Sequence, residues 1–351
     1  MLLSRFAVKQ ILRLSVKILW FTAKMANDPE NIGGIPVTSE AIGFAADEMI
    51  LCGKCAKTNP PNRLNCFYCG HGLELSEELA AGIRFAPSEI EDWEPGINLV
   101  VTSGVNDLDP QAIAAAISLG AEVTDSLANV EPPFPLFRIK PDEADEVEAR
   151  LKRLGLSVSR VEDAALALTK PAIRLKGIDL TTDPLTFHPF NSETSTSVNA
   201  SDIVLVVAGS IVTTTAESKL KKTRKDIKEI DSHISSSDHT AIDIYTSADE
   251  VGYRILPHGF DFSCLGAAKS LIAADNVRKL IEKLADDFPN AVIDRSYASK
   301  AAILDHVWPP TVTNISKGIA RSWFGVQRAT GTATSNESQF TRYSRMRRKL
   351  I

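Results

Sequence analysis

The sequence has only five cysteines among 351 residues, and four of them lie between positions 52 and 69. This distribution argues against a disulfide framework, which needs cysteines spread through the fold, and it favours a reducing compartment. The start of the chain also lacks a clean apolar segment, because Lys9, Arg13 and Lys17 interrupt it. A cleavable secretory signal and a membrane-spanning helix are therefore not expected there. We expect a cytoplasmic protein.

The sequence also lacks the short motifs of common catalytic sites. It has no phosphate-binding Gly-x-x-x-x-Gly-Lys loop, no Gly-x-Ser-x-Gly elbow and no His-Glu-x-x-His pair. Two weaker candidates are left: His239 near Asp243, and His258 near Asp261 and Cys264. The apolar neighbours of Cys264 favour a buried small side chain over a nucleophile. We therefore expect a non-enzymatic protein, with an enzyme centred on His258, Asp261 and Cys264 as an alternative.

The feature that stands out is a pair of Cys-x-x-Cys sequences, Cys52 with Cys55 and Cys66 with Cys69, ten residues apart. Four thiolates supply the tetrahedral sulfur shell that Zn²⁺ favours and leave no open position for water or substrate. We predict one structural zinc ion on these four residues. His71 could replace a thiolate, but beside four cysteines we expect it to be a bystander. Two disulfides are the alternative interpretation.

The sequence around the cysteines, from Leu51 to Leu73, resembles the small zinc ribbons of bacterial multidomain proteins. Asn59-Pro60 follows the first cysteine pair, and Gly70 follows the second. The resemblance implies zinc binding but no activity, and it makes a bacterial protein the expectation. Gly53 and Gly70 lie where a positive φ would let backbone N–H groups point at sulfur.

The cysteine spacing is also similar to that of the Ran-binding-protein zinc fingers, whose members bind single-stranded RNA or ubiquitin. The RNA-binding members carry a Trp two positions before the first Cys, where this chain has Ile50. The ubiquitin-binding members carry Thr-Phe after the second Cys, where this chain has Ala56-Lys57. These positions support neither ligand. Lys54, Lys57 and Arg63 form a modest basic face, which is more typical of solvation than of nucleic-acid binding.

Charge is segregated along the chain, although the net charge is only −5. Residues 1–24 carry five basic and no acidic side chains, with Arg5, Lys9, Arg13 and Lys17 four positions apart. This spacing predicts a basic amphipathic helix suited to an anionic membrane surface. A helix docked on the protein's own core, or a translation start at Met25, would also explain the pattern. We expect linkers at residues 25–47 and 76–97 on either side of the zinc ribbon at 48–75.

Residues 98–163 alternate between strand and helix patterns. The apolar run at 98–102 predicts a strand, and Asp109-Pro110 predicts the start of a helix at 110–117. Residues 121–130, 136–139, 141–155 and 156–161 predict a helix, a strand, a helix and a strand. This order resembles the carboxy-terminal domain of the bacterial ribosomal stalk protein and the related Clp-protease adaptor fold. The resemblance implies a small α/β sandwich. The stalk domain recruits translation factors through a lysine-rich helix, whereas the segment Ala121–Asp125 contains no lysine, so that function is not expected here.

Residues 171–309 contain short alternating apolar runs separated by turn signals, followed by a helical pattern at 276–288. Short strands with polar connections predict a β-rich domain, either an antiparallel sheet or a partly closed barrel similar to the pleckstrin-homology fold. The polar insertion 219–240 mixes lysines with acidic residues. We expect a solvated loop there, with a charged helix or an extended hairpin as the other forms and phosphate binding as a weaker alternative.

Residues 310–351 lack apolar periodicity and are basic towards the end, which predicts a disordered basic tail. The chain as a whole is thus predicted to be an α+β multidomain protein. We expect an adaptor or scaffold that contacts protein partners, with the membrane surface as a further contact through residues 1–24. The alternatives are an RNA- or ribosome-associated factor that uses the ribbon and the basic tail, and the enzyme described above.

Overall fold

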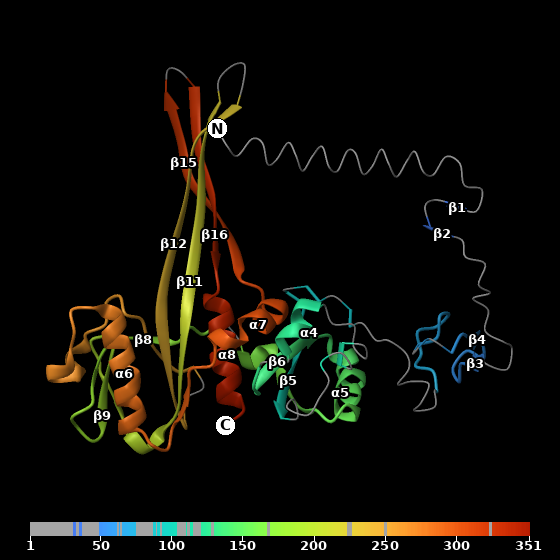
Figure 1. Cartoon of the computed structure of the whole chain (residues 1–351), viewed down its shortest axis with the longest axis horizontal. Coiled ribbons are helices and arrows are strands. Elements are labelled where there is room, and N and C mark those ends of the chain that lie inside the picture. The colour runs from blue at the N-terminus through green and yellow to red at the C-terminus, as the bar shows by residue number, and fades with distance from the viewer. Residues whose placement is uncertain are drawn as a thin grey trace. The chain divides into compact units, whose positions relative to one another are not determined.

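The computed structural model describes residues 31–32, 35–36, 49–74 except 62 and 64, 87–103 except 89 and 92, 110, 113–114, 121–127, 130–166, 169–222, 227–248, 251–322 and 325–351. The chain forms two compact units, Met1–Ala80 and Ala81–Ile351 (Figure 1). The predicted amphipathic helix 1–24 and most of both predicted linkers lie outside the described residues. No helix among the described residues is long and apolar enough to cross a membrane.

The first unit contains two short antiparallel strand pairs. Strands β1 (Asn31–Ile32) and β2 (Ile35–Pro36) form one pair, and β3 (Ile50–Leu51) and β4 (Thr58–Asn59) form the other. Residues 49–74, here called the ribbon, have a small core of Cys52, Cys66 and Leu73. A core of this size stabilises little by itself, so the ribbon needs a further source of stability.

The second unit begins with a three-stranded antiparallel sheet of order β6-β5-β7, where β5 is Ile97–Ser103, β6 is Phe134–Ile139 and β7 is Ser157–Glu162. Helix α4 (Ala121–Leu127) precedes β6, and helix α5 (Ala144–Arg153) precedes β7. Among the described residues the predicted order of elements is present, and most of the helix predicted at 110–117 lies outside them. The α5 residues Ala144, Val147 and Leu151 are buried in one cluster with residues of the sheet.

The main body of the second unit is a nine-stranded sheet of order β10-β9-β8-β13-β12-β11-β16-β15, with β14 pairing beside β11. Two of its pairings, β13 with β8 and β11 with β14, are parallel. The sheet is open, so the barrel predicted as one of two forms is not what the structure contains. Its strands are β8 (Ile173–Asp179), β9 (Leu185–Pro189), β10 (Thr196–Val198), β11 (Ile203–Lys222), β12 (Ile227–Thr246), β13 (Tyr253–Ile255), β14 (Val292–Asp294), β15 (Thr311–Ser322) and β16 (Gly325–Ser335).

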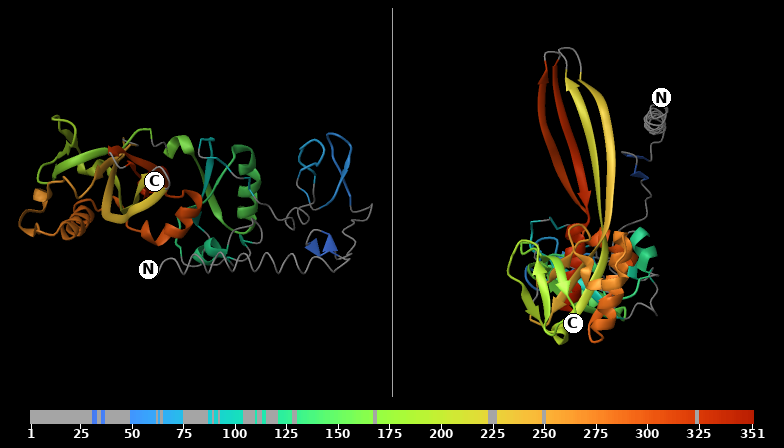
Figure 2. Two further views of the ribbon diagram at one scale, coloured as in Figure 1. Left: turned by 90° about the horizontal axis from the view of Figure 1, so that it is seen from above. Right: turned by 90° about the vertical axis from the view of Figure 1, so that its left-hand side faces the viewer.

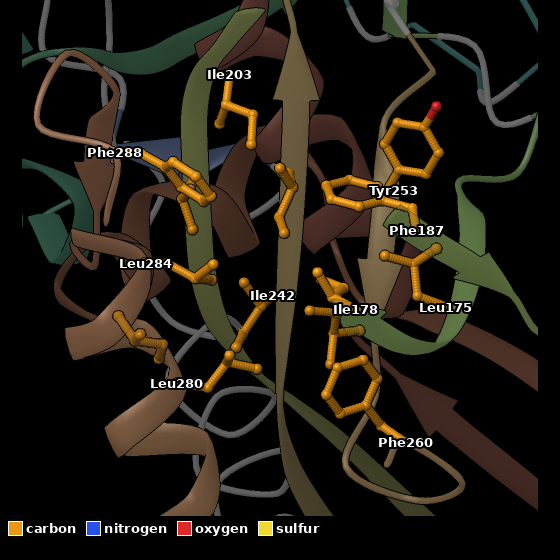
Figure 3. Packing of buried hydrophobic residues seen from close by; sticks show 14 of the residues in the cluster. Leu175, Ile178, Phe187, Ile203, Ile242, Tyr253, Phe260, Leu280, Leu284 and Phe288 are labelled. Carbon is orange, nitrogen blue, oxygen red and sulfur yellow. The ribbon is translucent and has the colours of Figure 1, made fainter. Parts of the chain in front are cut away.

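Helices cover both faces of this sheet at the base of β11 and β12. On one face, Leu280, Leu284 and Phe288 from α6 (Ala273–Asp287) and the residue after it pack near Ile203 and Ile242 (Figure 3). The neighbouring β12 residues Ala241 and Tyr245 belong to a second cluster with helix α8 (Glu337–Lys349). Successive strand residues point to opposite faces, so the apolar run at the base of β12 supplies two cores at once.

The region 98–163, predicted as a separate domain, shares its packing with the later sequence. Ile303 of helix α7 (Ala301–Val307) belongs to the same buried cluster as Leu99 and Phe134. The indole Nε1–H of Trp308, which is fully buried, donates to Asn98 Oδ1 at 2.8 Å. The two regions therefore form one compact unit and not two independent domains.

The long strands β11, β12, β15 and β16 continue beyond the cores as a four-stranded projection (Figures 1 and 2). We call residues 213–222, 227–237, 311–322 and 325–335 the arm. No buried cluster among the described residues includes an arm residue. The polar insertion 219–240 is the outer part of the β11–β12 hairpin, so the extended hairpin is the predicted form that the structure contains.

The end of the chain differs from the prediction. Residues 310–351 are not a disordered tail: they form the hairpin β15–β16 and then α8, whose Phe340, Tyr343 and Met346 are fully buried. The basic residues of α8 also bind within the fold. Arg345 donates to Lys170 O, Arg348 donates to the carbonyls of Thr246 and Ser247, and Arg347 pairs with Asp294 at 2.5 Å. These internal contacts offset the cost of burying charge and explain the basic composition.

Candidate metal centre

Four cysteine thiols lie together in the ribbon. All four Sγ atoms lie within 4.8 Å of one another. Cys52 Sγ is 3.7 Å from Cys69 Sγ, and Cys55 Sγ is 3.5 Å from Cys66 Sγ. A disulfide would bring two sulfurs to about 2.05 Å, and all four thiols are free. The predicted cluster of four cysteines is confirmed, and the cystine alternative is wrong for this structure.

Two similar turns bring the cysteines together. In the first, Ala56 N–H donates to Cys52 O at 2.9 Å; in the second, Gly70 N–H donates to Cys66 O at 2.9 Å. Ala56 and Gly70 each follow the second cysteine of a pair, and both have positive φ, 53° and 71°. Gly70 therefore has the predicted positive φ, and its own N–H donates to a carbonyl oxygen and not to sulfur. Gly53 does not have a positive φ, because the positive φ of the first turn falls on Ala56.

Asn59, at the end of β4, supports the cluster through hydrogen bonds. The sequence pattern did not predict this role. Its fully buried amide donates to Cys66 Sγ at 3.4 Å and to Lys57 O at 2.8 Å, while its Oδ1 accepts from Phe67 N–H at 2.8 Å. Tyr68 N–H also donates to Cys66 Sγ, at 3.4 Å. Hydrogen bonds of this kind orient a sulfur ligand and stabilise its thiolate form. The signal in the sequence was Asn59-Pro60, which begins four positions after Cys55.

The facing thiols Cys55 and Cys66 have pKa values that move in opposite directions. Burial opposes ionisation of Cys66, but the N–H donors of Tyr68 and Cys69 and the neighbouring Cys55 outweigh it and lower the pKa to about 6. A hydrogen bond with the Lys57 backbone favours the Cys55 thiolate, yet burial and the other three thiols raise its pKa to about 12. Two thiolates this close repel each other unless a cation lies between them.

The cluster has the dimensions of a single closed metal site. A tetrahedron with metal–sulfur bonds of about 2.3 Å has sulfur–sulfur edges of about 3.8 Å, close to the distances between these thiols. In the described part of the chain, the group consists of the four cysteines without His71, which agrees with the bystander role predicted for it. The cluster can therefore hold one metal ion with four protein ligands.

The ribbon also exposes two adjacent aromatic side chains beside the cysteines, Phe67 at 67% and Tyr68 at 55%. Their rings meet edge to face with centroids 5.4 Å apart. Arg63 Cζ lies 4.9 Å from the centre of the Phe67 ring, and Lys57 Nζ lies 4.3 Å from the centre of the Tyr68 ring. The modest basic face predicted from the sequence is thus joined to an aromatic surface, which the sequence argument had missed.

The residues of the alternative enzyme site do not form a linked constellation. Asp261 is exposed and caps the turn after it, accepting from Ser263 N–H at 3.0 Å and from Lys269 Nζ at 3.1 Å. Burial, followed by the charge of Asp261, raises the pKa of the Cys264 thiol. Among the described interactions, no hydrogen bond or ion pair joins His258, Asp261 and Cys264 to one another. Cys264 instead packs against the buried cluster under α6.

The second candidate pair, His239 and Asp243, does not form a site either, because the two residues have different partners in the fold. Both residues lie on β12, but Asp243 is fully buried and binds Arg254 in a two-point ion pair of 2.7 and 2.8 Å. His239 pairs in register with Ile211 near the base of the arm. A buried carboxylate held by arginine at both oxygens is not free to orient a histidine.

Comparison of the chain with protein-family models, with curated protein sequences and with solved structures finds no match. The four-cysteine cluster is therefore the part of the predicted resemblance that the structure supports. The likeness of residues 98–163 to the stalk and Clp-adaptor domains receives no support from these comparisons.

Proposed function

We propose that this protein is a non-enzymatic adaptor that binds a protein partner through its arm, with the ribbon held by one structural zinc ion. The arm is the observation that carries this proposal. β11 and β12 are each 20 residues long, and only their bases belong to hydrophobic clusters: among the described residues, no arm residue is a member of one. A projection of this length adds little to core stability, so its use lies in the surface that it presents.

The described surface of the arm is suited to contact along its length. It is rich in Ser and Thr, which supply hydroxyl donors and acceptors, and it exposes Ile234 at 73% and Val312 at 63%. Strand β15 is the last strand in the order of the sheet as far as the structure describes it, so its outer edge offers backbone N–H and C=O groups. An extended partner segment can add to such an edge through main-chain hydrogen bonds.

Zinc is the ion that best fits the ribbon. Four sulfur donors select a soft or borderline metal, and tetrahedral sulfur coordination is typical of structural Zn²⁺. The closed ligand set leaves no position for a substrate, which agrees with a structural role. The small core of the ribbon needs such an ion for its stability.

Shortening the arm is expected to remove partner binding without unfolding the protein. Ser235, Thr215, Ala333 and Thr313 form one row across the four strands, so both hairpins can be closed at the same level. Joining Thr215 to Ser235 and Thr313 to Ala333 through Asn-Gly turns deletes the outer arm and leaves every described core cluster intact. We expect a change of less than about 3 °C in melting temperature.

The measurement is affinity capture with quantitative mass spectrometry, comparing the full chain with the shortened variant. Proteins lost only from the shortened variant are the expected partners, and cross-linking should map them to β11, β12, β15 or β16. A variant that replaces Lys279 and Glu282 of α6 with alanine, away from the arm, serves as the control. An identical set of captured proteins from the full and shortened chains would contradict the adaptor proposal.

A second candidate function, binding of single-stranded RNA by the ribbon, is favoured by the exposed Phe67 and Tyr68 with their cationic neighbours. Aromatic rings beside basic groups stack nucleic-acid bases and attract phosphates. The basic end of the chain no longer contributes to this alternative, because the α8 arginines bind carbonyls and Asp294 within the fold.

Replacing Phe67 or Tyr68 with alanine is expected to weaken binding of a 20-nucleotide poly(U) strand about tenfold, since stacking contributes about 1–3 kcal/mol per base. Fluorescence anisotropy at several salt concentrations measures this, and affinity should fall as salt rises. Leu51→Ala, an exposed aliphatic change on the same ribbon, is the matched control. Equal weakening by all three variants, or no salt-dependent binding by the unaltered protein, would exclude this candidate.

A further inference from the structure

A cavity of about 440 Å³ lies in the second unit, apart from the metal centre. Its lining comes from the start of β8, from β13, from the base of the arm and from the first turn of α8. Small-molecule sites in proteins commonly occupy about 300–1,000 Å³ and combine an apolar wall with a few polar groups. This cavity has both, with Ala172, Leu256 and Ala333 on the apolar side and two arginines on the polar side.

The two arginines are direct neighbours across the sheet. Arg174 on β8 and Arg254 on β13 are register partners in a parallel pair, and both line the cavity. Like charges placed opposite each other on adjacent strands destabilise a sheet unless counter-charges relieve them. Arg254 has such a partner, because Asp243 binds its Nε and Nη2 at 2.7 and 2.8 Å.

Arg174 has no such partner. No carboxylate among the described residues lies within ion-pair distance of it. Its guanidinium lies over the Phe190 ring, with Cζ 4.2 Å from the centroid, and one terminal nitrogen donates to His258 O. Its Nε–H is buried and has no hydrogen-bond acceptor. The Nε atoms of Arg345, Arg347 and Arg348 are likewise buried without a hydrogen-bond acceptor, but of these four arginines Arg174 is the one that lines the cavity. A buried donor without an acceptor is costly, so the Arg174 nitrogen indicates where a ligand oxygen would be stabilised.

Arg254 also retains a donor on the cavity side. Among the described residues, the hydrogen-bond partner of its Nη1 is Glu337 Oε1, at the long distance of 3.4 Å, and the Glu337 side chain is 58% exposed. The first turn of α8, with Glu337 and Ser338, faces the same cavity, and its positive helix end favours an anion. Glu337 therefore occupies a position that a bound anion could take over while the glutamate turns to solvent.

We propose that this cavity binds a small organic monocarboxylic acid, with its carboxylate between Arg174 and Arg254 and its apolar body against Leu256, Ala172 and Ala333. The carboxylate accepts from Arg174 Nε–H and replaces Glu337 at Arg254 Nη1. A monoanion fits better than a phosphate dianion, because Asp243 balances one of the two arginines and one positive charge is left once Glu337 has turned to solvent. The same chemistry is found in a free acid and in the carboxyl end of a peptide.

The probes are hexanoate for a free acid, N-acetyl-leucine for a peptide end and inorganic phosphate as the dianion, each titrated into the full chain by calorimetry. One or both carboxylates should bind, and phosphate should bind more weakly. Arg174→Gln should weaken carboxylate binding about tenfold to a hundredfold, because it replaces the charged guanidinium donor with a shorter, neutral amide. Glu337→Gln should strengthen binding, since it removes the competing carboxylate.

Two further variants separate a site from a general charge effect. Arg278→Gln on the exposed surface of α6 changes the net charge equally and should leave binding unchanged. Ala172→Leu fills the cavity without touching either arginine and should reduce binding, with circular dichroism confirming the fold. The proposal is overturned if neither carboxylate binds below 10 mM, if phosphate binds more tightly than both, or if Arg174→Gln and Arg278→Gln have the same effect.

Discussion

Replacing Cys66 with serine, or removing the metal with a chelator, is expected to unfold the ribbon while residues 81–351 stay folded. Cys66 is buried, faces Cys55 across the cluster and accepts hydrogen bonds from Asn59 and Tyr68. Structural zinc sites of this kind contribute an apparent free energy of about 10–16 kcal/mol at neutral pH, far more than the three-residue core of the ribbon supplies.

Metal content by mass spectrometry and amide hydrogen exchange provide the measurements. The unaltered chain should carry one zinc ion, and Cys66→Ser should lose both the ion and the protection of residues 49–74. The matched control is Cys264→Ser, which changes the cysteine outside the cluster and should retain the ion. A Cys66→Ser protein with a full complement of zinc and a protected ribbon would be incompatible with the proposed metal centre.

Shortening Phe340 to alanine is expected to destabilise the second unit by about 3–5 kcal/mol. This side chain is fully buried on α8, with its ring 5.2 Å from the Tyr297 ring and 5.1 Å from Arg254 Cζ. It also packs directly on Gly209 of β11, where an added Cβ would lie 2.6 Å from a ring carbon. Denaturant unfolding followed by circular dichroism measures the loss.

Two comparisons test the packing argument. Ile234→Ala, on the exposed arm, should change the free energy of unfolding by less than about 0.5 kcal/mol. Gly209→Ala should cost about 1–3 kcal/mol by itself through overpacking, and less in the Phe340→Ala background, because the close contacts with the Phe340 ring are removed and that with Tyr297 Cδ1 at 2.7 Å is left. Unchanged stability of Phe340→Ala would mean that α8 is not part of the core.

The candidate metal site could be predicted from the sequence because its determinants are local. Two Cys-x-x-Cys pairs ten residues apart need only short turns to bring four sulfurs together, and the structure has those turns. The finer features of the site were less accessible. The positive φ fell on Ala56 and not on Gly53, since the turn requires it after the second cysteine, whichever residue stands there.

The end of the chain shows where local reasoning failed. Phe340, Tyr343 and Met346 recur at three-residue spacing, but arginines, serines and threonines stand between them and hide the apolar face. The arginines suggested a solvent-exposed, disordered segment, because isolated charges prefer water. In the fold they donate to the backbone carbonyls of residues 170, 246 and 247. These residues are distant in the sequence, so a local pattern could not identify them as partners.

By itself, the sequence determined the four-cysteine cluster, the order of elements in residues 97–162 and the alternating strands at the base of the large sheet. The tertiary structure decided that the polar strands of the arm pair with one another, that the last helix completes a core and that Arg174 and Arg254 meet at one cavity. The physical reason is the distance along the chain over which each interaction acts. Turn geometry, metal chelation and apolar periodicity act over a few residues, whereas strand pairing and burial of charge depend on partners up to 175 positions away.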